Sequence, residues 1–299
     1  MKKKLLLLYN PTSGRAQIGK RLDEILDVFF DADYEVTIYA IRPGYGAEEI
    51  LRDRGEDFDL VVCCGGDGTL HHTVNGLMQL AKRPVLGYLP SGSTNDFASN
   101  LGLGKDLLED CNIITHGVPF TYDIGLFHEN RYFNYVAAIG AFTDVSYSTP
   151  QETKNALGYF AYIIEGIKRL PFNTKYHAKI TLDTETIEDD YLYAAISNSF
   201  SVGGMDLSGH AQIHLDDGLF ELLLIKAPQN ILDLQVILGK LMTRDFSGPL
   251  VRLLHTTAVN FEFDTAVPWT LDGEFGGAWQ NCSISIVQKA IAILCPPLH

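Results

Sequence analysis

The chain has 299 residues, of which 46% are hydrophobic and 20% are charged, a composition typical of a globular protein. Its formal net charge of −14 argues against a nucleic-acid-binding protein, because such proteins need a basic surface to meet the phosphate backbone. A chain of this length can fold without disulfides or a structural metal, and it favours two domains over one.

The first part of the chain, residues 1–125, alternates between strand and helix patterns. The short apolar run Leu5–Tyr9 is typical of a parallel strand that is buried on both faces. Apolar residues at helical spacing follow between Ile18 and Phe30. The next strands and helices in chain order are predicted at Tyr34–Ile41, Ala47–Arg54, Leu60–Cys64, Leu70–Met78 and Val85–Tyr88. This alternation predicts βαβ units and a mostly parallel sheet.

From Tyr122 onward the pattern becomes rich in strands, with two helical interruptions at Asn155–Arg169 and Ile231–Met242. Turn sequences such as Asp216-Asp217-Gly218 and Asp272-Gly273 separate some of the strands. The strands are predicted at Tyr122–Leu126, Arg131–Ala138, Lys175–Leu182, Leu192–Ser197, Leu219–Ile225 and Val259–Phe263. We therefore expect a β-rich second domain, built as an antiparallel sandwich.

The five cysteines are odd in number, and no two have the spacing of metal ligands. Cys63 and Cys64 lie in an apolar run and are predicted to be core residues of a protein from a reducing cytosol. The apolar run Leu5–Leu8 is too short for a signal peptide, and no apolar stretch approaches the ~18 residues that suggest a membrane span. We expect a cytoplasmic protein that is soluble or peripheral to the membrane.

A glycine-rich loop follows the predicted strand Leu60–Cys64 and precedes a predicted helix. It consists of Gly65, Gly66, Asp67, Gly68 and Thr69. Glycines at such a turn let backbone N–H groups approach a phosphate, and the helix N-terminus adds a favourable dipole. The alternative is a tight turn that only needs positive φ angles, and we favour phosphate binding. The spacing is not that of a Walker A motif, because no Gly-Lys-Ser/Thr ends it.

Two further loops of small polar residues follow the first and the fourth predicted strand. They are Asn10, Pro11, Thr12, Ser13 and Gly14 after the first strand, and Gly92, Ser93, Thr94, Asn95 and Asp96 after the fourth. The first loop alone could equally be a helix cap and turn. Because parallel strands end at the same edge of a sheet, where open α/β sheets bind ligands, we expect the three loops to converge on one phosphate site.

The ordered set of loops resembles the diacylglycerol kinase catalytic family, which includes soluble bacterial diacylglycerol kinases and the sphingosine and ceramide kinases. The residues that carry the resemblance are NPTSG, GGDGT and G-[ST]-x-N-D, and it continues in Asn155–Tyr159, Leu215–Gly218 and Asp272–Glu274. It covers nearly the whole chain. It implies an NAD-kinase-like α/β domain at residues 1–125, an acceptor domain at 126–287, and a last strand within 288–299 that returns to the first domain.

The resemblance also implies roles for individual residues. The three loops would bind ATP, and Asp272 or Glu274 would be the general base toward a lipid hydroxyl. Asp217, with the backbone carbonyls of His214 and Leu219, would hold a structural Mg²⁺. From chemistry alone, Asp67 is a candidate ligand for a catalytic Mg²⁺, because hard cations prefer oxygen. The alternative for both acidic segments of the second domain is a plain hairpin turn.

The implied reaction is ATP-dependent phosphorylation of a lipid alcohol, with diacylglycerol as the first candidate and phosphatidic acid as its product. The implied partners are a lipid substrate and the inner face of the membrane, and a homodimer is left open. Two positions depart from the family pattern, since Ile41 stands where a Thr is common and Gly46 where an acidic residue or His is common. These departures leave a nucleotide-binding regulatory protein without turnover as one alternative. An NAD kinase or other small-alcohol kinase is another, because NAD kinases share the GGDGT loop.

Overall fold

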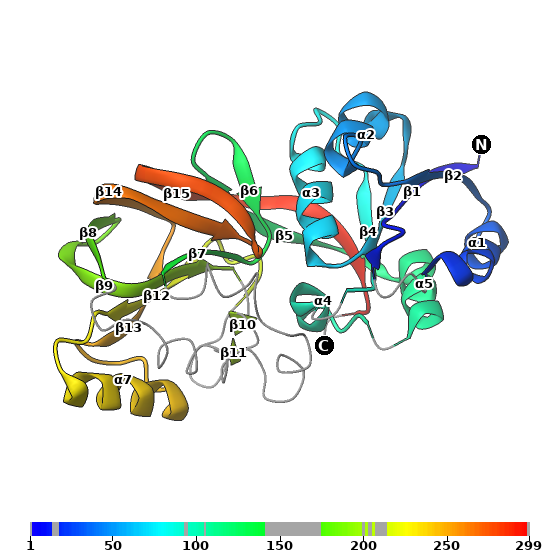
Figure 1. The fold of residues 1–299 in the computed structure, drawn as a ribbon. Coiled ribbons are helices and arrows are strands. Elements are labelled where there is room, and N and C mark those ends of the chain that lie inside the picture. Colours follow the sequence, from blue (N-terminus) through cyan, green and yellow to red (C-terminus); the bar gives the residue numbers. More distant parts are fainter. Residues whose placement is uncertain are drawn as a thin grey trace. The chain divides into compact units, whose positions relative to one another are not determined.

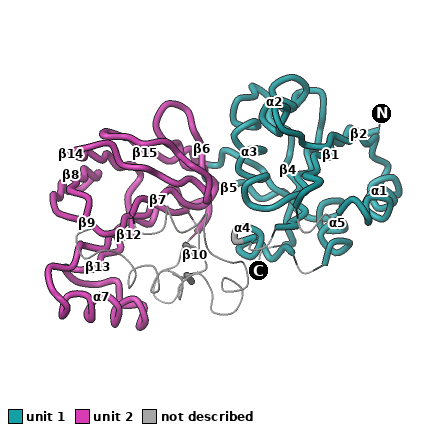
Figure 2. The backbone as a smooth tube through the Cα atoms, in the orientation of Figure 1, with its two compact units in different colours: residues 1–123, 289–299 teal, residues 124–288 magenta. Residues whose placement is uncertain are grey.

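The computed structural model describes residues 2–13, 18–92, 95–104, 106–140, 175–198, 201–202, 205–206 and 214–297. The chain divides into two compact units (Figure 2). Unit 1 comprises Met1–Asp123 and Lys289–His299, and unit 2 comprises Ile124–Gln288. The chain therefore passes between the units twice, once after Asp123 and once after Gln288.

Unit 1 is an alternating β/α fold (Figure 1). Its elements are β1 (Lys3–Tyr9), η2 (Ile18–Lys20), α1 (Leu22–Asp31), β2 (Tyr34–Ala40), α2 (Ala47–Arg54), η3 (Gly55–Asp57), β3 (Leu60–Gly65), α3 (Asp67–Met78), β4 (Val85–Pro90), α4 (Asp96–Asn100) and α5 (Leu107–His116). The strands lie in the order β2-β1-β3-β4 and are parallel. Next to β4, Ile293 near the end of the chain pairs in parallel with Leu86.

The sheet of unit 1 is buried because its strands are continuous apolar runs. Leu5 to Leu8 are fully buried, as such runs require when helices cover both faces of a sheet. Helices α1 and α5 pack through residues such as Phe29 and Ile114 on the face that carries Leu5 and Leu7, and α3 packs against β3 beside α2. Cys63 and Cys64 belong to this core, as predicted, and burial raises the pKa of the Cys63 thiol to about 12.

Unit 2 is a β-rich antiparallel fold. Its elements, with β5 beginning in unit 1 and β15 ending there, are β5 (Val118–Phe127), β6 (Arg131–Phe133), β7 (Val136–Gly140), β8 (Tyr176–Leu182), β9 (Thr186–Ser197), β10 (Ser201–Val202), β11 (Met205–Asp206), β12 (Phe220–Lys226), α7 (Ile231–Thr243), β13 (Val251–Thr256), β14 (Ala258–Leu271) and β15 (Glu274–Cys295). The strands run in the order β13-β12-β9-β7-β14-β15, while β8 pairs with both β9 and β14. The predicted fold class, an α/β domain followed by a β-rich antiparallel domain, is confirmed.

Two apolar cores stabilise unit 2. One is centred on Trp269, whose ring contacts Phe127 and Phe261 at centroid distances of 5.2 and 5.1 Å. The other forms where Ile237 and Leu241 of α7 pack on the opposite face of β9, β12 and β13. Within the part of the chain that the structure describes, no helix is long and apolar enough to cross a membrane.

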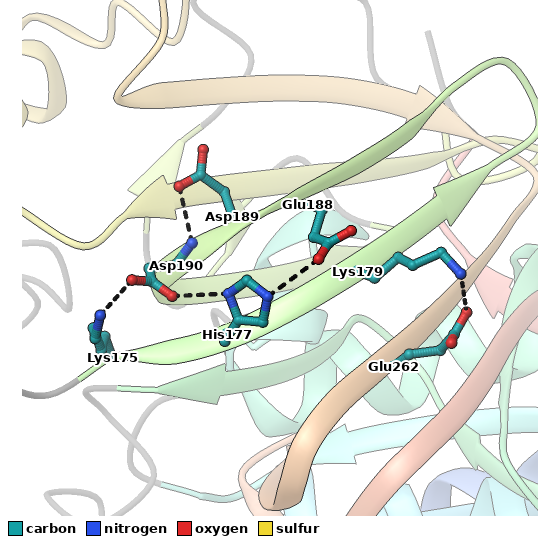
Figure 3. Close-up of polar contacts among 7 residues, drawn as sticks. All are labelled: Lys175, His177, Lys179, Glu188, Asp189, Asp190 and Glu262. Carbon is teal, nitrogen blue, oxygen red and sulfur yellow. Dashed lines mark hydrogen bonds and ion pairs between the residues drawn. The ribbon is translucent and has the colours of Figure 1, made fainter.

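The outer surface of unit 2 carries a ladder of charged side chains (Figure 3). The imidazole of His177 on β8 lies between Asp190 (3.0 Å) and Glu188 (3.3 Å) of β9. Lys175, directly before β8, pairs with Asp190, and Lys179 on β8 pairs with Glu262 of β14 at 2.9 Å. Alternate residues of an extended chain face the same side, so Lys175 before β8 and His177 and Lys179 on it form one row. Hydrogen bonds to these carboxylates raise the pKa of His177, and the bond to Asp190 has the largest effect.

Several predicted boundaries were wrong. The strand expected over Arg131–Ala138 is interrupted between β6 and β7, because the backbone of Asn134 and Tyr135 turns to the Asp272 carboxylate. Strand β15 begins at Glu274, well before the last strand that the resemblance implied within 288–299, and helix α5 was missed. The helix predicted at Asn155–Arg169 lies outside the described residues.

Candidate functional site

The three loops that were expected to converge begin at the carboxyl ends of β1, β3 and β4. These strands are parallel neighbours, so the loops emerge at one edge of the sheet. The amide of Asn10 donates to the carbonyl of Cys64 at 3.0 Å, and the amide of Ser91 donates to the carbonyl of Gly65 at 2.9 Å. The strand register therefore continues into the loops and fixes where each one starts.

Side chains then bind the loops to one another. The Asn10 Nδ2 group donates to the Thr69 hydroxyl at 3.2 Å, which joins the first loop to the glycine-rich loop. The Ser91 hydroxyl donates to the Ser13 hydroxyl at 3.2 Å, which joins the first loop to the third. Within the third loop, the Asn95 side chain accepts from the amide of Gly92 at 2.8 Å. The three loops thus form one hydrogen-bonded cluster.

Two glycines allow the loops to pack backbone against backbone. A Cβ atom on Gly92 would lie only 2.7 Å from the Cα of Gly66, closer than real Cβ contacts occur, and one on Gly66 would lie 3.1 Å from the Cα of Gly92. Any larger residue at Gly92 must therefore push the loops apart. The glycines are needed for this close approach, since neither Gly66 nor Gly92 has a positive φ angle.

The N-terminus of α3 opens into this cluster. Gly66 is the N-cap in an extended conformation, and no side chain of the described residues caps the helix. An α-helix leaves its first four N–H groups without intrahelical partners, and its dipole favours an anion at this end. Asp67 is the first helical residue, and its negative charge adds to burial in raising the pKa of the Tyr88 hydroxyl. The cluster has the geometry of a phosphate site.

Some of the expected ligands cannot be placed. Gly14, Ser93 and Thr94 lie outside the described residues, and Asp96 is described only as the first residue of α4. Pro11 and Thr12 are exposed on the first loop, where the Thr12 amide and hydroxyl both donate to the Asn10 side chain.

Ile41 and Gly46, the two residues that depart from the family pattern, both lie in regular backbone hydrogen bonding. The amide of Ile41 donates to the carbonyl of Tyr9 at 2.9 Å, so Ile41 extends the β1–β2 pairing by one residue. Gly46 is the N-cap of α2, and its amide donates to the Glu49 side chain at 2.9 Å. This capping arrangement places the carboxylate of Glu49 against Gly46, where the pattern has an acidic residue or His.

In unit 2 the turn Asp272-Gly273 joins β14 to β15. Both residues have positive φ angles, 51° and 89°, as a two-residue hairpin turn of the favoured type requires. Asp272 is only 3% exposed, and its carboxylate accepts four hydrogen bonds. The donors are the amide and side chain of Asn134 (2.8 and 3.2 Å) and the amides of Tyr135 (3.0 Å) and Val136 (3.2 Å).

Glu274 has a different environment from Asp272. It is the first residue of β15, it is exposed, and its carboxylate makes no hydrogen bond or ion pair with the described residues. The next residue, Phe275, is also exposed. The sequence could not tell the two carboxylates apart, but their environments differ. The carboxylate of Asp272 is hydrogen-bonded within the protein, whereas Glu274 is exposed, and a proton acceptor must be accessible to its substrate.

The expected cation segment is the loop Leu215–Leu219, which leads into β12. The Asp217 carboxylate accepts from the amide of Leu219 at 2.9 Å through Oδ1, and Gly218 has a φ of 78°. A Cβ on Gly218 would lie 2.1 Å from Nε2 of Gln288, so the loop packs against the end of unit 2. No three His, Cys, Asp or Glu side chains of the described ranges could hold a metal ion together.

Sequence reasoning missed three residues that support these segments. Asn134, Tyr135 and Asn198 are buried, and they connect the Asp272 turn with the Leu215–Leu219 loop. The amide of Asn198 donates to the carbonyl of Tyr135 at 3.1 Å, and its side chain donates to the carbonyl of Leu215 at 3.3 Å. The available sequence signal was the polar residue Asn134 inside an otherwise strand-like run, since a polar side chain there needs a hydrogen-bond partner if it is buried.

Two family models together match nearly the whole chain. The one described as the diacylglycerol kinase catalytic domain matches residues 4–127, and the one described as the YegS C-terminal NAD kinase beta sandwich-like domain matches residues 138–295. A protein named diacylglycerol kinase from Staphylococcus carnosus is 34% identical over 284 residues, which cover 93% of this chain and 90% of that protein. One of the same name from Bacillus subtilis is 31% identical over 277 residues, covering 92% and 91%.

Solved structures agree with this match at the level of the fold. A crystal structure from Bacillus anthracis has a TM-score of 0.84 and 24% identity, covering 99% of this chain and 96% of that one. A second one, named as a diacylglycerol kinase from the same organism, has a TM-score of 0.80 and 22% identity, covering 99% and 98%. The architecture of the two units is thus one that experimental structures share.

Proposed function

The chain belongs to the diacylglycerol kinase family, and from this premise we propose that it transfers the γ-phosphoryl group of ATP to the hydroxyl of diacylglycerol, giving phosphatidic acid. The observation that carries the proposal is the cluster of three contacting loops at the N-terminus of α3, in a chain that aligns over 93% of its length with a named diacylglycerol kinase. The resemblance and the local geometry point to the same edge of unit 1.

ATP would lie with its phosphates against the glycine-rich loop. Backbone N–H groups at the start of α3 would neutralise phosphate charge, and the dipole of that helix would add to the effect. Phosphoryl transfer needs little more than positioning and charge neutralisation, and the loops would supply both. Asp67 would contribute an oxygen ligand to a catalytic Mg²⁺ at the phosphates, since Mg²⁺ is commonly held by one or two carboxylates together with phosphate oxygens.

Glu274 is the general base in this proposal. Its carboxylate is exposed, whereas that of Asp272 already accepts four hydrogen bonds. Glu274 would take the proton of the attacking hydroxyl as the new P–O bond forms and the bond to the leaving ADP breaks. Asp272 would position Glu274, because it fixes the turn that precedes it.

A structural Mg²⁺ in the Leu215–Leu219 loop fits the donor set. Asp217 Oδ2 has no partner among the described residues, and the main-chain carbonyls of His214 and Leu219 would complete the oxygen ligands. Oxygen-only ligands with water are what Mg²⁺ prefers. When bound, the ion would supply a fixed positive charge that braces the loop, and Asp217 would hold it there.

The acceptor would be reached at a membrane surface, because diacylglycerol resides in the bilayer. The enzyme would therefore work as a peripheral protein, and its overall charge of −14 means that docking depends on a local patch and not on the whole molecule.

The test is ADP release from Mg²⁺-ATP with a panel of detergent-dispersed lipid alcohols that includes diacylglycerol, sphingosine and ceramide. NAD as acceptor and a reaction without lipid run beside it, together with the Glu274→Gln variant. We expect turnover with diacylglycerol and a loss of at least about 100-fold in kcat for Glu274→Gln, as expected when a general base is removed.

Other outcomes would reject parts of this proposal. Turnover on NAD alone would place the chain with the NAD kinases. An absence of turnover on every acceptor, with ATP still raising the melting temperature, would indicate a nucleotide-binding regulatory protein. Wild-type kcat in Glu274→Gln would remove Glu274 from the role of base.

A further inference from the structure

A continuous chain of hydrogen bonds joins the Asp272–Glu274 turn to the Leu215–Leu219 loop within unit 2. Asp272 Oδ1 accepts from the amide of Tyr135 at 3.0 Å. The carbonyl of Tyr135 accepts from the amide of Asn198 at 3.1 Å, and Nδ2 of Asn198 donates to the carbonyl of Leu215 at 3.3 Å. Among the described residues, Asn198 therefore connects the two segments through its backbone and its side chain.

The chain is shielded from water along its length. Asn198 is 0% exposed, and Leu215, Tyr135 and Asp272 are buried as well. A buried polar group without a partner is costly, and hydrogen bonds are stronger in a medium of low dielectric constant. A shift of the loop relative to the turn would break a bond that water cannot readily replace, so the two segments must keep their separation.

The position of Asn198 in the fold explains why one residue can do this. It follows Ser197, the last residue of β9, which is hydrogen-bonded to β7 and β12 on its two sides. Its backbone therefore continues the sheet toward Tyr135, while its side chain reaches Leu215 on the loop before β12. A side-chain amide has the donor that this carbonyl requires, whereas a carboxylate of the same shape has none.

We infer that Asn198 is a positioning residue that sets the loop carrying Asp217 against the turn carrying Glu274. This inference rests on the proposed function, in which the base Glu274 and the cation segment around Asp217 must keep a fixed distance from each other during phosphoryl transfer. Displacement of a catalytic group by about 1 Å can cost on the order of 100-fold in rate. In the proposed mechanism Asn198 touches neither ATP nor acceptor, and it acts only through the two segments.

The test compares Asn198→Asp with Ser197→Ala in the full-length protein. Asn198→Asp keeps the shape of the side chain, removes the donor to Leu215 and places an acceptor against that carbonyl. The control removes the neighbouring hydroxyl, which is equally buried and has no hydrogen-bond partner among the described residues. Asn198→Ser serves as a second variant, which is too short to reach Leu215, in case Asn198→Asp does not fold.

Two readouts separate positioning from mere stability. Hydrogen exchange measured by mass spectrometry without nucleotide should accelerate in peptides that cover residues 134–136 and also in those that cover 215–219. In the kinase assay, kcat should fall at least about 10-fold while KM for ATP stays within about twofold, because the loops of unit 1 are untouched. Ser197→Ala should match the wild type in both measurements.

The inference is wrong if faster exchange is confined to residues 215–219, or if kcat of the folded variant equals that of Ser197→Ala. These failures differ from failure of the proposed function. A wild-type protein that phosphorylates no lipid would reject the kinase proposal, whereas the exchange experiment would still decide whether Asn198 joins the two segments.

Discussion

The Asp272→Asn variant tests whether Asp272 has a structural role that Glu274 does not share. Asparagine tolerates the left-handed conformation of Asp272, whose φ is 51°, so the backbone is not strained by the change. It retains only one acceptor oxygen, and its NH₂ group must face two N–H donors that now bond to the carboxylate. Two hydrogen bonds to a charged group are lost, at roughly 1.5–3 kcal/mol each, which gives a destabilisation of roughly 3–6 kcal/mol.

This loss is measurable as a change in the unfolding of unit 2. At about 2–4 °C per kcal/mol for a domain of this size, the melting temperature should fall by at least about 6 °C, followed by circular dichroism or by urea unfolding. Glu274→Gln is the matched control, because Glu274 is exposed and its carboxylate makes no hydrogen bond or ion pair with the described residues. Its melting temperature should therefore stay within about 1 °C of the wild type. Equal melting temperatures for Asp272→Asn and the wild type would refute the view that Asp272 clamps the turn.

Three further outcomes are expected. Gly92→Ala must push the third loop away from Gly66 and should raise KM for ATP at least about 10-fold. Gly19→Ala is the control, because a Cβ there meets nothing within 4 Å, and it should leave KM for ATP unchanged. Similar KM values for the two variants would contradict the proposed phosphate site. Burial raises the pKa of Asp110 from 3.8 to about 6, so the free energy of unfolding should fall by roughly 3 kcal/mol as pH rises through that window. Urea unfolding of Asp110→Asn should show a flatter dependence of that free energy on pH. The carboxylate partners of His177 raise its pKa, so the contribution of His177 to stability is complete below pH 6.5 and is lost as pH rises through the raised pKa. His177→Gln should therefore reduce the pH dependence of the melting temperature. An unchanged dependence would contradict this role of His177.

The position of the three loops at one sheet edge could be predicted from the sequence, because the information is local. A buried apolar strand followed by small polar residues occurs three times in unit 1, and parallel strands bring their ends to one edge by geometry alone. Packing such as that of Gly66 against Gly92 then follows from the absence of side chains. Neither step requires knowledge of a residue far away in the chain.

The site in unit 2 was less accessible because its interactions are long-range. The bond between Asp272 and Asn134 spans 138 residues, and it interrupts a stretch that alternates like a continuous strand. Periodicity reports which face of a strand is buried, and it carries no information on whether a backbone amide bonds to a neighbouring strand or to a distant carboxylate. For the same reason, Asn198 gave no signal in the sequence.

The Asp-Gly-Glu segment illustrates how neighbouring residues acquire different chemistry. A two-residue turn with positive φ angles favours Asp followed by Gly, so Asp272 and Gly273 satisfy the backbone first. The carboxylate of Asp272 then points inward to four N–H donors, and the chain leaves the turn with Glu274 at the start of β15, in solvent. A hairpin turn and a catalytic segment, which from sequence looked like alternatives, are therefore compatible, because the rigid turn is what would hold a base in place for phosphoryl transfer.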